Sequence, residues 1–406
     1  MPDFQGLAIV AAVAFCAPLL LGFLPGLRLP SVVLELVAGI VIGPSVLGWV
    51  QVDDSIALFA LVGLAFLLLI AGLEIDFTRL RGPALRLAVG AFLLTIVLAL
   101  AAGGLLDLGG FVSSPLLVAI ALSATSLGIV ITILKDAGET ESRLGQTLIA
   151  SCSLAEVLPI VLLSLFFSME SSGTGTRVIL LAAFGVLGAL VGLAIIGFER
   201  WRRLSATLLR LQDTTAQIRV RGAFLLLAVF VVLAGQFGLE AILGAFIAGA
   251  VIKLVDTDGA MTHPRFREKL EAAGFGVFIP FFFVTSGIRF DLDALLGSAS
   301  ALAQVPLFLA ALLLVRGLPA LLYRGFDARR TTAAALLQAT SLSFIVVAAD
   351  LGRELGVLSG ETAAALIAAG LVSVLAFPLV ALTVLRGARA DADERLAKPA
   401  LAARGS

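Results

Sequence analysis

The stretch that decides the fold is "ALSATSLGIVIT" at residues 121–132, which recurs in altered form as "LLQATSLSFIVV" at 336–347. Each copy places the adjacent hydroxyls of Ala-Thr-Ser-Leu near the middle of a long apolar run. Ser and Thr in such a run commonly bond back to their own helix or allow close helix packing. A helix interrupted at this point instead needs those hydroxyls for its freed backbone groups. The two copies therefore point to two broken helices.

Composition identifies the chain as an integral membrane protein. Of its 406 residues, 60% are hydrophobic and 14% are charged, and the mean hydropathy is +1.12. Soluble domains carry about 25% charged residues, and an apolar block of about 20 residues is long enough to cross a membrane as a helix. A β-barrel is excluded because barrel strands alternate in short segments. The sequence predicts an all-α polytopic membrane protein with thirteen transmembrane helices, at residues 5–24, 31–49, 55–74, 84–106, 112–134, 144–169, 177–198, 219–236, 239–254, 273–289, 298–322, 330–350 and 359–385.

The distribution of Lys and Arg predicts the orientation. Most of the 28 basic residues fall in alternate loops and therefore on one side of the membrane, which is the cytoplasmic side by the positive-inside rule. Only Arg177, Arg289 and Arg353 fall on the other side, and Arg316 lies within a span. We expect a multi-pass protein of the cell inner (plasma) membrane with its N-terminus outside and its C-terminus in the cytoplasm.

An internal duplication organises the chain. The two Ala-Thr-Ser-Leu copies start at Ala124 and Ala339, 215 residues apart, and "GLEIDFTRL" from Gly72 matches "GIRFDLDAL" from Gly287 at the same offset. The matched spans lie seven helices apart, so the second copy crosses the membrane in the opposite direction. Inverted repeats of this kind are typical of secondary transporters, although chance similarity in a sequence rich in Leu, Ala and Gly is the competing interpretation. The expected segments are a transmembrane domain 1–385 with repeats 5–169 and 219–385, a connector helix 177–198, and a short tail 386–406 without a regulatory domain.

Glu156, in "ASCSLAEVLPIVLL", is the candidate ion-binding carboxylate. It lies about 12 residues from either end of its span, which at about 1.5 Å per residue is near the bilayer midplane. Burial disfavours the charged form of a carboxylate, so such a group can bind either a proton or a cation. Ser153 shares its helical face, and Pro159 frees backbone groups that can help to coordinate an ion. A structural carboxyl group between helices is the alternative.

Three further charged residues lie within a predicted span or at its end. Arg316, the one basic residue well inside a span, either snorkels to the inner surface or supplies the counter-charge of Glu156. Glu35 lies nearer the inner end of the second span, where a half-solvated structural role is expected. Glu74, at the end of the third span, is expected at a solvated helix end.

Several segments together resemble the monovalent cation:proton antiporter superfamily. They are "LELVAGIVIGPSVLGWV", "FLLLIAGLEIDFTRLR", "ALSATSLGIVITILKDAG", "ILGAFIAGAVI" and "GFGVFIPFFFVTSGI". The resemblance is to the second branch, which includes Kef-type potassium/proton antiporters and bacterial sodium/proton antiporters. It covers roughly residues 10–385 and implies thirteen helices, inverted six-helix repeats with two crossed discontinuous helices, and a homodimer. It also implies that Glu156 is the ion-binding carboxylate, that Arg316 matches a basic residue of the family, and that the crossed helices carry Thr125, Ser126, Thr340 and Ser341.

The chain departs from the family pattern at two places. The usual site is a doublet of an acidic residue with Asp, Asn or Gln, whereas this chain has Ala155-Glu156. One carboxylate implies one proton for one monovalent cation, which is electroneutral exchange. The family's Arg-Gly-Glu segment in the second crossed helix is replaced by Ser341-Leu342-Ser343, which leaves the identity of the ion open.

The sequence therefore predicts a secondary transporter, not an enzyme, that exchanges Na+ or K+ for H+ by alternating access. Glu156 binds the proton and the cation in competition, with Thr125, Ser126 and Ser153 as neutral oxygen ligands, so that Glu156 and Thr125 hold the metal ion. Thr340, Ser341 and Ser343 lie at the opposing helix break, and Arg316 is the charge partner. No cofactor besides the transported ions and no nucleic acid is expected. A gated cation channel and an organic-anion symporter are the alternatives.

Overall fold

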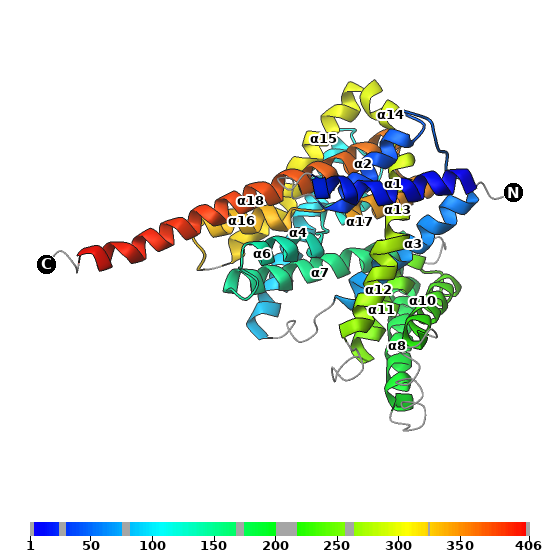
Figure 1. Ribbon diagram of the computed structural model, residues 1–406, viewed down its shortest axis with the longest axis horizontal. Helices are drawn as coiled ribbons and strands as arrows, with labels where there is room; N and C mark the ends of the chain where they lie inside the picture. The colour runs from blue at the N-terminus through cyan, green and yellow to red at the C-terminus, as the bar shows by residue number, and fades with distance from the viewer. Residues whose placement is uncertain are drawn as a thin grey trace. The chain divides into compact units, whose positions relative to one another are not determined.

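The described part of the protein is entirely helical. Its computed structural model describes residues 4–23, 30–74, 82–167, 174–199, 217–255, 264–323 and 325–402. Within those ranges every regular element is a helix and no strand occurs, as Figure 1 shows. The predicted all-α architecture is confirmed.

The helices group into two compact units, and each unit takes segments from both halves of the chain. Unit 1 comprises Met1–Ile75 and Ile160–Phe290, and unit 2 comprises Asp76–Pro159 and Asp291–Ser406. Unit 1 contains α1 (Phe4–Phe23), α2 (Ser31–Ile42), α3 (Asp54–Leu73), α8 (Thr174–Glu199), α10 (Ile218–Gln236), α11 (Ala241–Val255), α12 (Pro264–Ala273), η1 (Gly274–Phe278) and α13 (Ile279–Ile288).

Unit 2 contains the elements that carry most of the predicted site. They are α4 (Gly82–Leu108), α5 (Pro115–Leu122), α6 (Leu127–Asp136), α14 (Leu292–Gly297), α15 (Ala299–Leu312), η2 (Leu313–Gly317), η3 (Leu318–Leu322), α16 (Ala328–Gln338), α17 (Ser343–Glu354) and α18 (Gly360–Ala402). The boundary between the units falls inside α7 (Arg143–Phe166), and the residues of α7 up to Pro159 belong to unit 2. Figure 1 shows α18 as one unbroken helix that leads to the C-terminus.

Eleven of the described helical segments have the length and composition needed to cross a membrane. Two further apolar helices, α2 and α11, occupy the second and ninth predicted spans but contain only 12 and 15 residues. The predicted helix over 31–49 is wrong in length, because α2 ends at Ile42. Gly43 takes an extended conformation (φ −70°, ψ 177°), as expected for a residue that precedes a proline, here Pro44. The count of thirteen spanning helices therefore stays a prediction.

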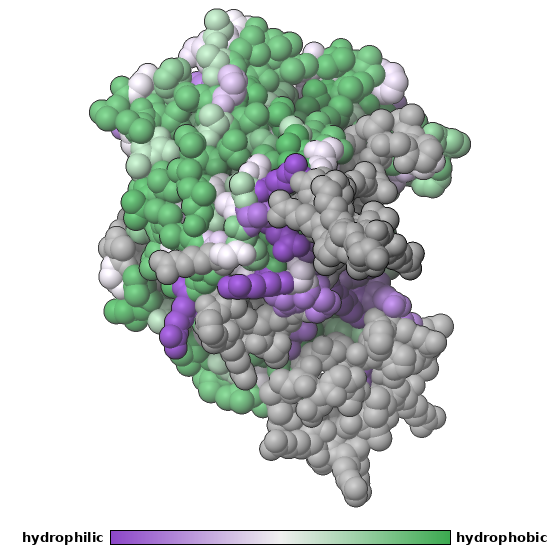
Figure 2. All heavy atoms as spheres, turned by 90° about the vertical axis from the view of Figure 1, so that its left-hand side faces the viewer, coloured by the Kyte–Doolittle hydropathy of each residue, from purple (hydrophilic) through white to green (hydrophobic). Residues whose placement is uncertain are grey.

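The surface of the described helices is apolar. Large hydrophobic side chains are exposed on several of them, for example Phe15 (68% exposed) on α1, Leu193 (64%) on α8 and Leu225 (65%) on α10. Figure 2 shows a face on which the described residues are mostly hydrophobic, with hydrophilic residues gathered in a narrower zone. Exposed apolar area of this extent is unfavourable in water and matches the acyl chains of a bilayer. The chain is a multi-pass membrane protein.

Glycines allow two close helix crossings in unit 1. Gly39 of α2 lies against Gly287 of α13, and a Cβ at Gly39 would come within 2.2 Å of the Val284 carbonyl oxygen. Gly72 of α3 lies against Gly249 of α11, and a Cβ at Gly249 would come within 2.0 Å of a main-chain oxygen. Small residues let helix backbones approach in this way inside membranes. Gly72 and Gly287 are the residues that begin the two matched sequence segments, so they occupy comparable crossings.

Two of the long apolar segments are broken helices. Residues 123–126 separate α5 from α6, and residues 339–342 separate α16 from α17. The two breaks are in direct contact, because the main-chain nitrogen of Ser126 donates to the carbonyl oxygen of Thr340 at 2.9 Å. The predicted pair of crossed, discontinuous helices is confirmed.

An apolar core holds this crossing in place. Leu127, Val130 and Leu134 lie on one face of α6 at helical spacing, and they are at most 2% exposed. The core also contains buried side chains of α7, α16 and α18, among them Leu148, Ile149, Leu337, Ala381 and Leu382. The half-helix after the first break is thereby fixed against the helix that carries Glu156.

Candidate ion-binding site

The first break is bonded to α7 beside Glu156. Pro159 lies inside α7 and has no N–H, so the carbonyl group of Ala155, four residues earlier, loses its helical donor. That carbonyl oxygen accepts a hydrogen bond from the main-chain nitrogen of Thr125 at 3.2 Å. The expectation that Pro159 frees a backbone group near Glu156 fits this geometry, and the freed group holds the broken helix.

The two breaks also satisfy each other. The Ser126 nitrogen donates to the Thr340 carbonyl oxygen, and the Leu342 nitrogen donates to the Ser126 hydroxyl oxygen at 3.1 Å. Ser126 is 8% exposed and Thr340 is 0% exposed. Main-chain groups freed at a helix break need partners in an environment without water. Ser126 and Thr340 supply them, while Ser343 begins the helix α17.

Arg316 is buried and bonded to threonines. It is 1% exposed and lies in the π-helical turn η2. Its Nε donates to the Thr125 hydroxyl oxygen at 2.7 Å and its Nη1 to the Thr95 hydroxyl oxygen at 3.0 Å, while Nη2 has no hydrogen-bond partner among the described residues. The side chain therefore does not snorkel to the surface. Thr125 in turn donates to the carbonyl oxygen of Gln338 at 2.5 Å, so its hydroxyl joins Arg316 to α16.

Glu156 lies half-buried on α7, and Ser153 lies one turn before it. Ser153 is 5% exposed, and its hydroxyl donates to the carbonyl oxygen of Ile149 in the same helix at 2.8 Å. Because the Ser153 proton is used within the helix, the lone pairs of its oxygen can coordinate a cation. The structure thus brings α7, both breaks and Arg316 together within unit 2.

The sequence interpretation missed several polar residues of this cluster. Tyr323 lies after η3, Ser151 on α7 and Gln338 at the end of α16, and the Tyr323 hydroxyl oxygen is 2.6 Å from Ser151 Oγ and 2.8 Å from Gln338 Oε1. Ser373 on α18 accepts a hydrogen bond from the Ser341 nitrogen at 3.1 Å. Ser and Thr are frequent in membrane helices, which hides Ser151 and Ser373. Tyr323 could have been singled out from the sequence, because it is the one tyrosine in the chain.

Glu35 is more buried than the sequence suggested. Glu35 is 3% exposed, so the expected half-solvated position is wrong. The close approach of α2 to α13 through Gly39 and Gly287 accounts for this, because Gly39 lies one turn from Glu35 on the same face of α2. The Oε2 atom of Glu35 has no hydrogen-bond partner among the described residues.

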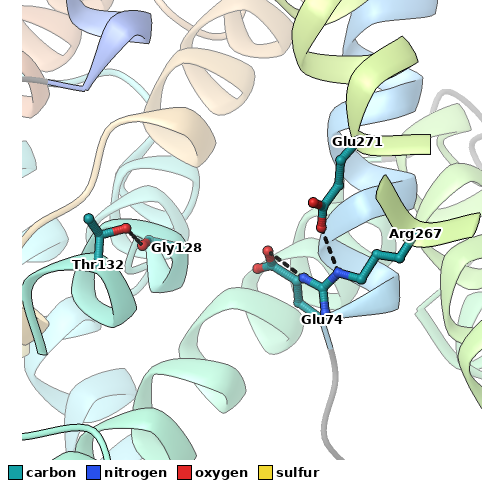
Figure 3. A network of polar contacts seen from close by, with 5 residues as sticks. All are labelled: Glu74, Gly128, Thr132, Arg267 and Glu271. Carbon is teal, nitrogen blue, oxygen red and sulfur yellow. Dashed lines mark hydrogen bonds and ion pairs between the residues drawn. The ribbon is translucent and has the colours of Figure 1, made fainter. Parts of the chain in front are cut away.

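Glu74 forms part of an ion cluster in unit 1. Figure 3 shows the Arg267 guanidinium between two carboxylates, with Nε 2.5 Å from Glu271 and Nη2 3.7 Å from Glu74. The Glu74 side chain is 22% exposed, so this helix end is only partly solvated. Burial raises the pKa of Glu74 above its ordinary value, and the neighbouring Arg267 opposes that rise. The cluster belongs to unit 1 and not to the crossing of the broken helices.

Known proteins resemble this chain along most of its length. Residues 11–386 match the family model described as the sodium/hydrogen exchanger, transmembrane. Bacillus subtilis YjbQ is 29% identical over 393 residues, and the match covers 92% of this chain and 62% of that protein. The chain therefore spans less than two thirds of that relative. The Na+/H+-K+ antiporter GerN of Bacillus cereus is 28% identical over 306 residues, with 74% of each protein covered.

A solved structure has the same fold. The sodium/proton antiporter MjNhaP1 from Methanocaldococcus jannaschii, determined at pH 8, aligns with a TM-score of 0.68 at 19% identity, covering 95% of this chain and 100% of that chain. At this identity the likeness concerns the fold alone.

Proposed function

Because this chain belongs to the sodium/hydrogen exchanger transmembrane family, we propose that it exchanges a monovalent cation, Na+ or K+, for H+ across the membrane. The observation that carries the proposal is the bond between Thr125 N and the Ala155 carbonyl oxygen that Pro159 leaves without a helical donor. It fixes the break of one crossed helix beside Glu156. Interrupted helices that meet a carboxylate within a membrane are the setting in which secondary transporters bind ions.

Glu156 is the group that binds the proton and the cation in turn. A carboxylate that neutralises one positive charge can hold H+ or a monovalent cation, and binding of one excludes the other. Ser153 is the best placed neutral ligand on α7. Its hydroxyl donates a hydrogen bond to the Ile149 carbonyl oxygen, which leaves the oxygen lone pairs for a cation. Within the described part of the chain the Ser126 hydroxyl oxygen accepts one hydrogen bond, from Leu342 N, so its second lone pair can serve the same ion.

Thr125 has a different role from the one expected of a metal ligand. Its hydroxyl oxygen accepts a hydrogen bond from the Arg316 guanidinium and donates to Gln338. A cation would be repelled from an oxygen already bound to a guanidinium. We therefore assign Thr125 to holding Arg316, and Arg316 to supplying a fixed positive charge in unit 2 when no cation is bound.

Exchange of one cation for one proton follows from a single carboxylate at this site. Glu156 is preceded by Ala155, so the pair of residues carries one titratable group. One charge is then carried in each direction, and the cycle is electrically silent. Addition of Na+ and of K+ to separate proteoliposome samples shows which cation is exchanged.

The remaining architecture is part of the same proposal. The matching crossings of Gly39 with Gly287 and of Gly72 with Gly249 support inverted repeats over 5–169 and 219–385. The distribution of basic residues supports an N-terminus outside the cell membrane and a cytoplasmic C-terminus. The family resemblance supports a homodimer, and the transported ions are the small-molecule partners.

Reconstitution into proteoliposomes with an internal pH dye tests this function. Addition of Na+, K+ or Li+ to the unmodified protein should change the internal pH, and Glu156→Gln should abolish that change because it removes the titratable charge. Glu361→Gln is the matched control, since Glu361 is exposed in the first turn of α18. Exchange that persists in Glu156→Gln would refute the assignment of Glu156. A rate that changes when valinomycin and K+ clamp the membrane potential would refute electroneutrality and leave antiport intact.

A further inference from the structure

We propose that Tyr323 is a positioning residue that sets the affinity of the ion site, through hydrogen bonds that align α7 with the second broken helix. The inference rests on the proposed function, because it concerns the site at Glu156. Tyr323 is 3% exposed, and its partners Ser151 and Gln338 are 2% and 0% exposed. Three buried polar side chains in a membrane protein have to satisfy one another, since water does not reach them.

The direction of each bond follows from the chemistry of the groups. The amide oxygen Oε1 of Gln338 can only accept, so the Tyr323 hydroxyl donates to it over 2.8 Å. Because the phenol has one proton, its oxygen accepts a hydrogen bond from the Ser151 hydroxyl over 2.6 Å. The Tyr323 hydroxyl therefore links α7 to α16 through two bonds with defined roles. Phenylalanine at this position would leave both Ser151 and Gln338 without their partner.

The network leads directly to the ion site. Ser151 lies five residues before Glu156 on α7, about 7.5 Å along the helix axis. The main-chain oxygen of Gln338 accepts the hydrogen bond of Thr125, whose hydroxyl holds Arg316. Tyr323 thus controls the position of the helix that carries Glu156 relative to the break that carries Thr125. It does not touch the ion, so it acts through these neighbours.

A second contact supports α7 near its N-terminus. The Arg143 guanidinium carbon lies 5.9 Å from the centre of the Phe326 ring, in the range of a cation–π contact. Phe326 is three residues after Tyr323 in the sequence. Phe326 and Tyr323 therefore contact α7 at two positions, Arg143 and Ser151. The cation–π contact and the apolar core that contains Leu148 and Ile149 attach α7 to its neighbours, whereas the Tyr323 bonds fix its register near Glu156. Loss of the Tyr323 bonds should therefore change ion binding more than folding.

The test is Tyr323→Phe in the full-length chain, reconstituted as above, with initial rates measured against Na+ and K+ concentration. We expect the apparent cation affinity to fall about tenfold, which is the effect of one or two unsatisfied buried groups, while the maximal rate stays within about twofold. Because protons then compete better with the cation, the pH of half-maximal exchange at fixed Na+ should move to the alkaline side, by about one unit for a tenfold loss of affinity.

Ser151→Ala provides a second variant that breaks the same link and leaves the tyrosine in place. It should lower the affinity in the same direction, and Tyr323→Phe/Ser151→Ala should be little worse than Tyr323→Phe, since both remove one connection. Ser164→Ala is the matched control, because Ser164 is a buried serine of the same helix that bonds Glu240 N in unit 1. Its apparent affinity should be unchanged.

Unchanged affinity and pH dependence in folded Tyr323→Phe would overturn the inference. If that variant does not fold, unchanged affinity in Ser151→Ala overturns it. A fall in maximal rate with unaltered affinity would also overturn it, because a general loss of active protein has that effect. These outcomes are separate from a failure of the proposed function, which appears as an unchanged internal pH when Na+, K+ or Li+ is added to the unmodified protein.

Discussion

The two helix breaks of unit 2 share the sequence Ala-Thr-Ser-Leu but use it differently. In the first, Ser126 is the last residue before the helix resumes, whereas in the second that residue is Leu342, one step later in the tetrapeptide. The Thr125 hydroxyl bonds Arg316 and Gln338, while the Thr340 hydroxyl donates to Leu336 of its own helix at 3.1 Å. The first break uses its side chains for contacts between helices. In the second, the Thr340 bond stays within its own helix, and the Ser341 hydroxyl has no hydrogen-bond partner among the described residues.

The neighbours of each break explain this difference. Arg316 donates to Thr125 of the first break, and the residue 215 positions before Arg316 is Ala101 in α4. Each break also lies against a helix with a proline, Pro159 in α7 and Pro378 in α18. Three residues before Pro159 stands Glu156, and three before Pro378 stands Leu375. Identical local sequences thus make different contacts because the helices around them carry different side chains.

Removal of the Arg316 charge, which the first break contacts through Thr125, should lower the exchange rate more than loss of the threonine hydroxyl of either break. Arg316→Met keeps much of the buried volume but leaves the Thr125 and Thr95 hydroxyls without their donor and removes the positive charge beside the first break. We expect exchange to fall at least about a hundredfold, in line with loss of a buried, hydrogen-bonded charge. Dye-loaded proteoliposomes measure the rate, and Arg353→Met, at an exposed arginine of α17, is the control. Near-normal exchange in Arg316→Met would show that the guanidinium is dispensable.

A matched pair of threonine variants compares the two breaks directly. Thr125→Val leaves Arg316 Nε unsatisfied and should lower the exchange rate about tenfold. Thr340→Val removes only a bond within its own helix and should change the rate less than about twofold. Thr132→Val is the control, because Thr132 is exposed and donates to Gly128 of its own helix at 2.9 Å (Figure 3). Equal losses in Thr125→Val and Thr340→Val would mean that the two breaks are functionally equivalent.

Loss of the Ser373 hydroxyl should have the smallest effect, and on stability rather than transport. Ser373 accepts from the Ser341 nitrogen and lies 3.0 Å from the Ser341 carbonyl oxygen, so it supports the second break. Ser373→Ala should lower the melting temperature of the detergent-solubilised protein by about 2 °C, as expected for roughly one lost hydrogen bond. Scanning fluorimetry measures this, with Thr383→Val on the exposed face of α18 as control. A change in cation affinity instead would assign the second break to the ion site.

Much of the fold could be predicted because it follows from local chemistry. The apolar segments and the two breaks were found from residue composition and from hydroxyl pairs inside hydrophobic runs. The end of α2 at Ile42 was missed, although Gly43-Pro44 carried the signal, because continuous hydrophobicity obscured the conformational preference before a proline. The burial of Glu35 was also missed, since it depends on a glycine of α13 more than 240 residues away in the sequence.

The sequence by itself determined that this chain spans a membrane, where its helices break, and that Glu156 lies within a span. Each of these follows from the cost of placing polar groups in hydrocarbon, which depends on the residue and its close neighbours. Only the tertiary structure decided which groups meet. Arg316 bonds Thr95 across 221 residues, and Tyr323 bonds Ser151 across 172. Such pairs are set by how helices pack, because any buried hydroxyl can satisfy a donor and packing alone selects one.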